Sequence, residues 1–214
     1  MTSSFGGLER LELADWRRRV AALYVEVRSM YASDPAIALA HWRAQRETLF
    51  RTHPQSPVVA ADRPVFRAAH FDHDPRLAFA VALEPAPPAP PDMQPLALPD
   101  SGQGGLSFSR VGTVRIPFAE GERSLSVFWL AGYAGGLFLP FRDATNGQAT
   151  YGAGRYLLDT AKSADLGTDG DGRLILDFNF AYQPSCAFDP RWACPLAPPE
   201  NRLDLAIRAG ERLA

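Results

Sequence analysis

The sequence has only two cysteines and four histidines, and this scarcity limits the metal chemistry that it can support. The histidines all lie at or before His73, whereas Cys186 and Cys194 lie near the other end of the chain. With no CxxC pair, the usual four-ligand zinc sites cannot be assembled. The segment HFDHD (70–74) holds several potential ligands, but ligands so close in sequence rarely converge on one ion. We therefore predict no metal and no cofactor.

A basic excess is also missing. The chain has 22 Lys and Arg residues against 24 Asp and Glu, a net charge of -2 and a pI of about 6.1. Such a chain has no surplus positive charge for binding a phosphate backbone, so we predict no nucleic-acid partner. The GAGR segment at 152–155 is not a phosphate loop, because it lacks the Gly-Lys-Ser/Thr ending and precedes no predicted helix.

Long apolar runs are absent too. The longest uncharged run, 124–141, is interrupted by glycines and a proline and is too short to span a bilayer comfortably. The first residues, MTSSFGGLERLELADWRRR, carry charges where a signal peptide needs an apolar stretch. We expect a cytoplasmic protein with no membrane partner. Because 46% of the residues are hydrophobic, the chain has enough apolar surface for a folded core.

The N-terminal quarter of the chain has the apolar spacing of two helices. Residues three and four positions apart predict one apolar helix face: Trp16, Val20, Leu23, Tyr24, Val27 and Tyr31. Asp34-Pro35 supplies a cap and a first-turn proline for a second helix, which continues to about Phe50. The prolines of 53–57 end it. We predict a helical segment, 1–56, packed on the domain that follows.

The remainder, 57–214, has the pattern of many short strands. Large and small residues alternate over 77–83, and short apolar runs follow at 106–110, 112–118, 124–130, 137–141, 151–158, 174–182 and 203–207. Turn residues separate them, most clearly at 169–172. This pattern predicts a mainly β (α+β) fold: an antiparallel β barrel or two-layer sandwich with the two helices packed on it.

The densest group of polar residues lies in PFRDATNGQATYGAGRYL. The planar forks of Arg142 and Arg155 could clamp a carboxylate or phosphate. The same residues also fit a structural hairpin in which Arg155 pairs with Asp143 or Asp177, and we leave both interpretations open. The other candidate ligand-binding residues of this segment are Asp143, Thr145, Tyr151 and Tyr156.

Two further segments carry candidate acid–base groups. In LILDFNFAY, strand alternation would place Asp177 and Asn179 on one face, about 7 Å apart. Glu200 follows two stiff prolines and precedes Asn201, so its carboxylate could be held against other groups. We predict Asp177 and Glu200 as candidate catalytic residues, and Asn179 and Asn201 as ligand-binding residues. The alternative is that Asp177 faces water or pairs with an arginine, and that Glu200 begins a strand.

The two cysteines could form a disulfide. The bond would close a loop of about nine residues and contribute about 2.5 kcal/mol. In a reducing cytosol the thiols would more often remain reduced.

Several of these segments together resemble one family. PFRDATNGQATYGAGRYL, LDFNFAYQPSC, CPLAPPENRL and IRAGE are similar to the signature of a bacterial and archaeal family called domain of unknown function 1684. The resemblance implies no established activity. It suggests that these residues belong to the family pattern: Arg142, Asp143, Thr145, Tyr151, Arg155, Tyr156, Asp177, Asn179, Cys186, Cys194, Glu200 and Asn201.

The polar segments support one leading hypothesis. A polar pocket built from the Arg142–Arg155 hairpin, the Asp177 strand and the Glu200–Asn201 segment would bind a small anionic or carboxylate-bearing molecule, with acid–base or hydrolytic turnover as an extension. The alternative is a non-catalytic protein–protein interaction or structural module in which the arginines and acids pair internally. A monomer and a homo-oligomer are both compatible with the sequence.

Overall fold

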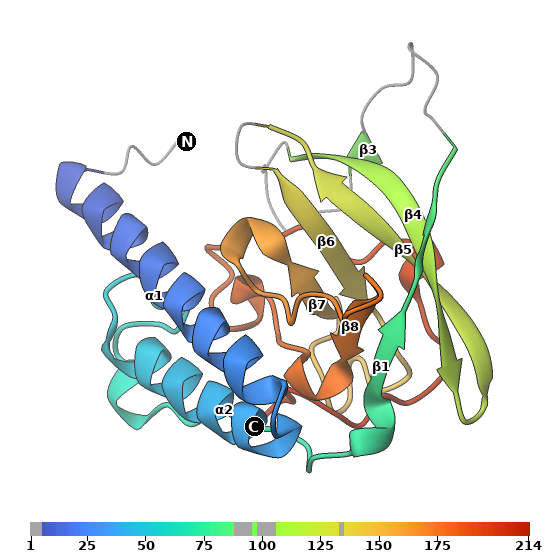
Figure 1. Ribbon diagram of the computed structural model, residues 1–214. Helices are drawn as coiled ribbons and strands as arrows, with labels where there is room; N and C mark the ends of the chain where they lie inside the picture. The colour runs from blue at the N-terminus through green and yellow to red at the C-terminus, as the bar shows by residue number, and fades with distance from the viewer. Residues whose placement is uncertain (1–5, 88–95, 98–105, 133–134) are drawn as a thin grey trace.

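The structure is a computed structural model that describes residues 6–87, 96–97, 106–132 and 135–214. It consists of a helical pair and two antiparallel sheets (Figure 1). The predicted mainly β, α+β class is confirmed. Among the described residues the larger sheet ends in two unjoined edges, so it is not closed into a barrel, and the two-sheet alternative fits. No helix in the described part of the chain is long and apolar enough to cross a membrane.

The helices α1 (Gly7–Tyr31) and α2 (Pro35–Thr52) form where the apolar spacing predicts them. The Asp34 carboxylate begins α2 by accepting the backbone N–H groups of Ala36 and Ile37 at 2.8 and 3.1 Å. The helix ends before Pro54, which disfavours helical geometry at the preceding residue. The two helices are joined by a buried hydrogen bond in which Trp42 Nε1 donates to the Tyr24 hydroxyl at 3.1 Å.

The larger sheet has the strand order β2-β4-β5-β6-β7, with β3 also paired to β4. Its strands are β2 (Leu83–Pro85), β3 (Leu96–Ala97), β4 (Ser107–Phe118), β5 (Gly121–Leu130), β6 (Gly136–Phe141) and β7 (Arg155–Asp159). In the smaller sheet β1 (Ala78–Val81) pairs with β8 (Leu174–Asp177). The runs 106–110 and 112–118, predicted as separate strands, form the single strand β4, which carries a bulge between Arg110 and Gly112.

The larger sheet has a hydrophobic core on each face. One core includes Val114, Ile116, Leu125, Val127 and, from the smaller sheet, Leu176. The other lies against the helices and includes Leu39, Trp42, Phe108, Phe128 and Phe138. Phe108 and Val114 lie an even number of residues apart but belong to different cores. The bulge between them accounts for this, because one extra residue reverses the alternation of faces.

Four strand predictions are wrong in extent. The run 77–83 divides between β1 and β2, and the run 151–158 becomes a strand only from Arg155. The runs 174–182 and 203–207 contain less strand than predicted. β8 stops at Asp177, because the Asp177 carboxylate accepts the N–H of Asn179 at 2.9 Å and begins the 3-10 turn Phe178–Phe180. Residues 203–207 form no strand. The Ile207 carbonyl accepts a hydrogen bond from Arg155 Nη2 at 2.8 Å, so a side chain occupies the place of a neighbouring strand.

Candidate functional site

Arg155 is the most enclosed of the predicted ligand-binding residues. Its side chain is fully buried, and Nη2 lies 2.7 Å from Asp143 Oδ2. The same guanidinium donates to the carbonyls of Ile207 at 2.8 Å, Glu211 at 3.1 Å and Ala209. Arg155 therefore fixes the C-terminal segment to the hairpin, while its buried Nε has no hydrogen bond to a described residue.

Asp143 and Thr145 complete this network inside the turn. Asp143 Oδ1 accepts the Thr145 N–H at 2.7 Å and the Thr145 hydroxyl at 2.5 Å. The side chain of Arg142 is partly exposed and donates to the Gly152 carbonyl at 2.9 Å. Burial, and then a hydrogen bond with Cys186, raise the pKa of the Tyr151 phenol to about 12. The hydrogen bonds and ion pair of this segment fit the second interpretation of the sequence, a structural hairpin in which Arg155 pairs with Asp143.

Asp177 and Asn179 form a second, separate network. Asp177 Oδ1 accepts the Asn179 side-chain amide at 2.8 Å, and Oδ2 accepts the Tyr31 hydroxyl at 3.0 Å. Asn179 also accepts the Asp74 N–H and donates to the Asp74 carbonyl. Burial raises the pKa of Asp177 despite these hydrogen bonds. The network joins β8 to the end of α1 and to the turn at Asp74.

Glu200 and Asn201 are adjacent in sequence but differ in burial. Asn201 is fully buried, accepts the Ser126 N–H at 2.8 Å and donates to the carbonyls of Ser126 and Pro140 at 2.9 and 2.7 Å. It therefore ties its segment to β5 and β6. Glu200 is exposed and makes no hydrogen bond within the described residues.

Removing the carboxylate of Asp177 and removing that of Glu200 should have different effects on stability. Asp177→Ala is expected to lower the free energy of unfolding by about 1–3 kcal/mol, because buried donors of Tyr31 and Asn179 lose their acceptor. Glu200→Ala should leave the urea midpoint unchanged, since its side chain supports no described contact. Equal losses of stability in the two variants would contradict this assignment.

The cysteines lie together in the C-terminal loop. The Cys186 N–H donates to Cys194 Sγ at 3.3 Å, and both residues are buried. A hydrogen bond with Cys186, together with burial, raises the pKa of the Cys194 thiol far above its usual value. A thiol held protonated in this way is a weak nucleophile.

The structure contains a partly enclosed cavity that was not among the predictions from the sequence. This cavity, called the aromatic cavity below, has a volume of about 430 Å³ and lies between the helices, the larger sheet and the loop 182–195. Of all the residues predicted for the site, only Tyr156 and Cys194 line it. The expected grouping of Arg142, Arg155, Asp177 and Asn179 therefore does not coincide with this hollow.

Aromatic rings from three parts of the chain form its walls. The helices contribute Trp16, Tyr24 and Phe50, the sheet contributes Phe108, Phe138 and Tyr156, and the loop contributes Tyr182 and Trp192. Neighbouring rings meet edge to face, with centroids 4.8 Å apart for Phe138 and Tyr156 and 5.7 Å for Tyr156 and Tyr182. Such walls suit a flat apolar body.

Arg46 lines the aromatic cavity and forms an ion pair with Glu211. Arg46 Nε and Nη2 donate to the Glu211 carboxylate at 2.5 and 3.3 Å, and the guanidinium lies 4.4 Å from the Phe50 ring centroid and 4.7 Å from that of Tyr182. Burial acts to lower the pKa of Arg46, but Glu211 outweighs it and holds this pKa above its usual value. Arg46 Nη1 makes no hydrogen bond to any described residue.

Two neutral polar groups beside this pair also lack partners. The Tyr182 hydroxyl and Gln183 Oε1 are buried and have no hydrogen bond within the described part of the chain. Burial raises the pKa of Tyr182 well above its usual value, and the Asp159 carboxylate adds to this, so the phenol stays protonated and can donate. Buried polar atoms are nearly always hydrogen-bonded, so these atoms indicate a place for a bound polar group.

The exposed lining residues mark the mouth of the aromatic cavity. They include Arg17 on α1 and Lys162, the only lysine of the chain. Lys162 Nζ lies 2.7 Å from Asp159 Oδ2, whereas Arg17 makes no ion pair with any described residue. The mouth thus carries two positive charges and one negative charge.

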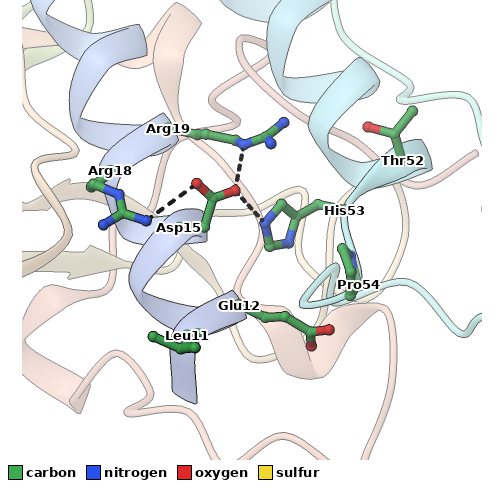
Figure 2. Close-up of a pocket in the computed structure, with 8 residues that line it drawn as sticks. All are labelled: Leu11, Glu12, Asp15, Arg18, Arg19, Thr52, His53 and Pro54. Carbon is green, nitrogen blue, oxygen red and sulfur yellow. Dashed lines mark hydrogen bonds and ion pairs between the residues drawn. The ribbon is translucent and has the colours of Figure 1, made fainter. Parts of the chain in front are cut away.

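A second hollow lies at the ends of the helices and is drawn in Figure 2. There Asp15 Oδ2 accepts from Arg19 Nε at 2.7 Å and lies 3.3 Å from His53 Nε2. His53 Nδ1 accepts the Gln55 N–H at 3.0 Å. Both ring nitrogens are thus engaged, so His53 has no lone pair left to act as a base, and we interpret this cluster as a link between the helices.

The sequence did contain one sign of the aromatic cavity. Trp42, Arg46 and Phe50 recur at four-residue spacing, which places an arginine on the apolar face of α2. A charged residue on that face needs a buried partner or an internal polar space. The residues that complete the cavity come from distant segments, and no local pattern connects them.

Comparisons with known proteins identify a family but no activity. Residues 67–212 match the family model described as "Protein of unknown function (DUF1684)", which confirms the resemblance found in the sequence. The chain is also similar to the solution NMR structure of an uncharacterized protein of Haloarcula marismortui, with 30% sequence identity and a TM-score of 0.60. That match covers 85% of this chain and 96% of the other. No curated protein matches the chain.

Proposed function

We propose that this chain, which belongs to the DUF1684 family of proteins of unknown function, binds a small anionic organic molecule in the aromatic cavity. The observation that carries the proposal is the combination of aromatic walls with buried polar atoms that have no protein partner. Ligand sites of soluble proteins are usually concave and apolar, with a few placed polar groups, and have volumes of about 300–1,000 Å³. The aromatic cavity has these properties.

The charges around the cavity favour an anion. Its lining contains the cations Arg17, Arg46 and Lys162 and the single carboxylate Asp159. Because Glu211 neutralises Arg46 and Asp159 neutralises Lys162, one positive charge remains. A carboxylate-bearing ligand would balance it.

The proposal is for binding and includes no turnover. Asp177 and Glu200, the predicted acid–base residues, do not line the aromatic cavity. The rival hypothesis, an interaction module, has one observation in its favour, since Arg155 and Asp143 form the internal pair that it requires. A ligand screen separates the two hypotheses, because an interaction module needs no small molecule.

A bulky residue in the cavity should abolish binding. Val20 on α1 lines the cavity, and Val20→Phe would place a ring inside it. In a thermal-shift screen against a metabolite panel, a ligand at a hundred times its dissociation constant should stabilise the wild-type protein by about 2.7 kcal/mol. We expect Val20→Phe to fold and to lose this response.

The matched control is Val25→Phe, the same substitution at a position on the same helix that is 60% exposed and does not line the cavity. It should retain the full ligand response. A ligand that stabilises Val20→Phe as strongly as the wild-type protein binds elsewhere and would refute the proposed site.

A further inference from the structure

We infer that the ligand is an aromatic carboxylate that also carries a neutral hydroxyl group. This inference rests on the proposed function, since it assigns one ligand group to the mouth and one to the inner end, which is defined here by Arg46 and the buried polar atoms of Tyr182 and Gln183. The carboxylate lies at the mouth between Arg17 and Lys162, and the hydroxyl group lies beside Arg46, Tyr182 and Gln183.

The inner end selects a neutral group because its charges are already balanced. Arg46 and Glu211 form a close pair, and Glu211 Oε2 also accepts the Gln183 N–H at 2.8 Å. A second anion there would be buried without a counter-charge of its own, which is costly.

The atoms without partners at this end specify the neutral group further. Gln183 Oε1 is a buried acceptor and requires a donor, whereas Arg46 Nη1 is a donor with no hydrogen bond to a described residue. The Tyr182 phenol can serve either role. A ligand hydroxyl both donates and accepts, so one such group can satisfy Gln183 and one of its neighbours together.

The mouth selects the anion because its positive charges are exposed and exceed its negative charge by one. Arg17 belongs to α1, and Lys162 belongs to the 3-10 turn Thr160–Lys162, which packs against α1. Asp159 compensates one of the two cations. A carboxylate at this place would keep part of its hydration, so it avoids the cost of full burial.

The aromatic walls would hold the ring of the ligand. They include Trp16, Phe50, Phe138 and Tyr156, which come from both the helices and the sheet. Offset or edge-to-face contacts with such rings favour an aromatic body over a flexible chain, because fewer rotatable bonds are immobilised.

Three matched probes test the inference: 4-hydroxyphenylacetate has both groups, phenylacetate lacks the hydroxyl, and 4-methylphenol lacks the carboxylate. Their affinities are measured by NMR chemical-shift titration of the full chain at low ionic strength. We expect 4-hydroxyphenylacetate to bind roughly fivefold more tightly than phenylacetate, the effect of one neutral hydrogen bond.

Two sets of variants test which residues bind the hydroxyl and which bind the carboxylate. Tyr182→Phe should reduce the preference for the hydroxylated probe to less than about twofold and leave phenylacetate binding unchanged. Tyr151→Phe, which alters a phenol outside the aromatic cavity, should keep the preference. The double variant Arg17→Met/Lys162→Met should weaken both carboxylates by roughly threefold or more, without affecting 4-methylphenol.

The outcomes distinguish this inference from the proposed function. If the probes bind and Val20→Phe abolishes binding, but the hydroxyl gives no preference or the neutral phenol binds best, the ligand class is wrong and the site stands. Absence of binding by all three probes also overturns the ligand class. The proposed function would then depend on the metabolite screen, in which a ligand of other chemistry sensitive to Val20→Phe would still support it.

Discussion

Replacing Asp143 with alanine is expected to lower the free energy of unfolding by about 3–5 kcal/mol, because the buried Arg155 would lose its ion-pair partner. Arg155 cannot turn toward solvent without also breaking its hydrogen bonds to the C-terminal carbonyls. Thr145 would lose the acceptor of both its N–H and its hydroxyl. Equilibrium unfolding in urea measures the loss as a lower midpoint.

An exposed pair of the same chemistry provides the control. Arg123 Nε lies 2.6 Å from Asp204 Oδ1, but the Asp204 side chain is 71% exposed. Asp204→Ala should therefore shift the urea midpoint far less, because solvent screens the pair and hydrates the remaining arginine. Similar shifts in the two variants would show that burial does not govern the strength of the Arg155 pair.

Arg155 also shows why the sequence left the role of its segment open. An arginine that binds a ligand and an arginine that binds backbone carbonyls can have the same neighbours in sequence. The deciding contacts come from Ile207, Ala209 and Glu211, more than fifty residues away. Local chemistry predicts that a guanidinium needs several acceptors, but it does not predict whether the protein or a ligand supplies them.

The helices and most strands could be predicted because their signals are local. The cap at Asp34 and the apolar spacing of both helices depend on residues within a few positions of one another. It is harder to predict which face of the sheet a strand residue occupies. The bulge at 110–112 reverses the face of Phe108, and this determines that Phe108 lines the aromatic cavity.

The end of β8 illustrates the same limit on a smaller scale. Alternation over LILDFNFAY predicts a strand to Tyr182, but the side chain of Asp177 competes for the backbone N–H of Asn179. Asp and Asn favour such local hydrogen bonds, which end a strand. The change of direction carries Tyr182 and Gln183 to the cavity wall.

Replacing Glu211 with alanine is the second large effect that we expect, again about 3–5 kcal/mol of stability. Arg46 would be left among aromatic rings without its counter-charge, and the Gln183 N–H would lose its acceptor. If the loss arises mainly from the unpaired cation, the double variant Arg46→Leu/Glu211→Ala should be more stable than Glu211→Ala alone. Urea unfolding of the two single variants and the double variant gives the coupling energy.

Acetate should reverse part of this loss, because Glu211→Ala leaves a hole of carboxylate size beside Arg46. At about 0.1 M, sodium acetate should raise the Tm of Glu211→Ala more than sodium chloride does, since a ligand that binds only the folded state stabilises it. The two salts should act alike on the wild-type protein and on Arg46→Leu/Glu211→Ala, which offer no unpaired cation. An equal response of all three proteins would contradict the balanced Arg46–Glu211 pair, and with it the argument that the inner end of the aromatic cavity selects a neutral group.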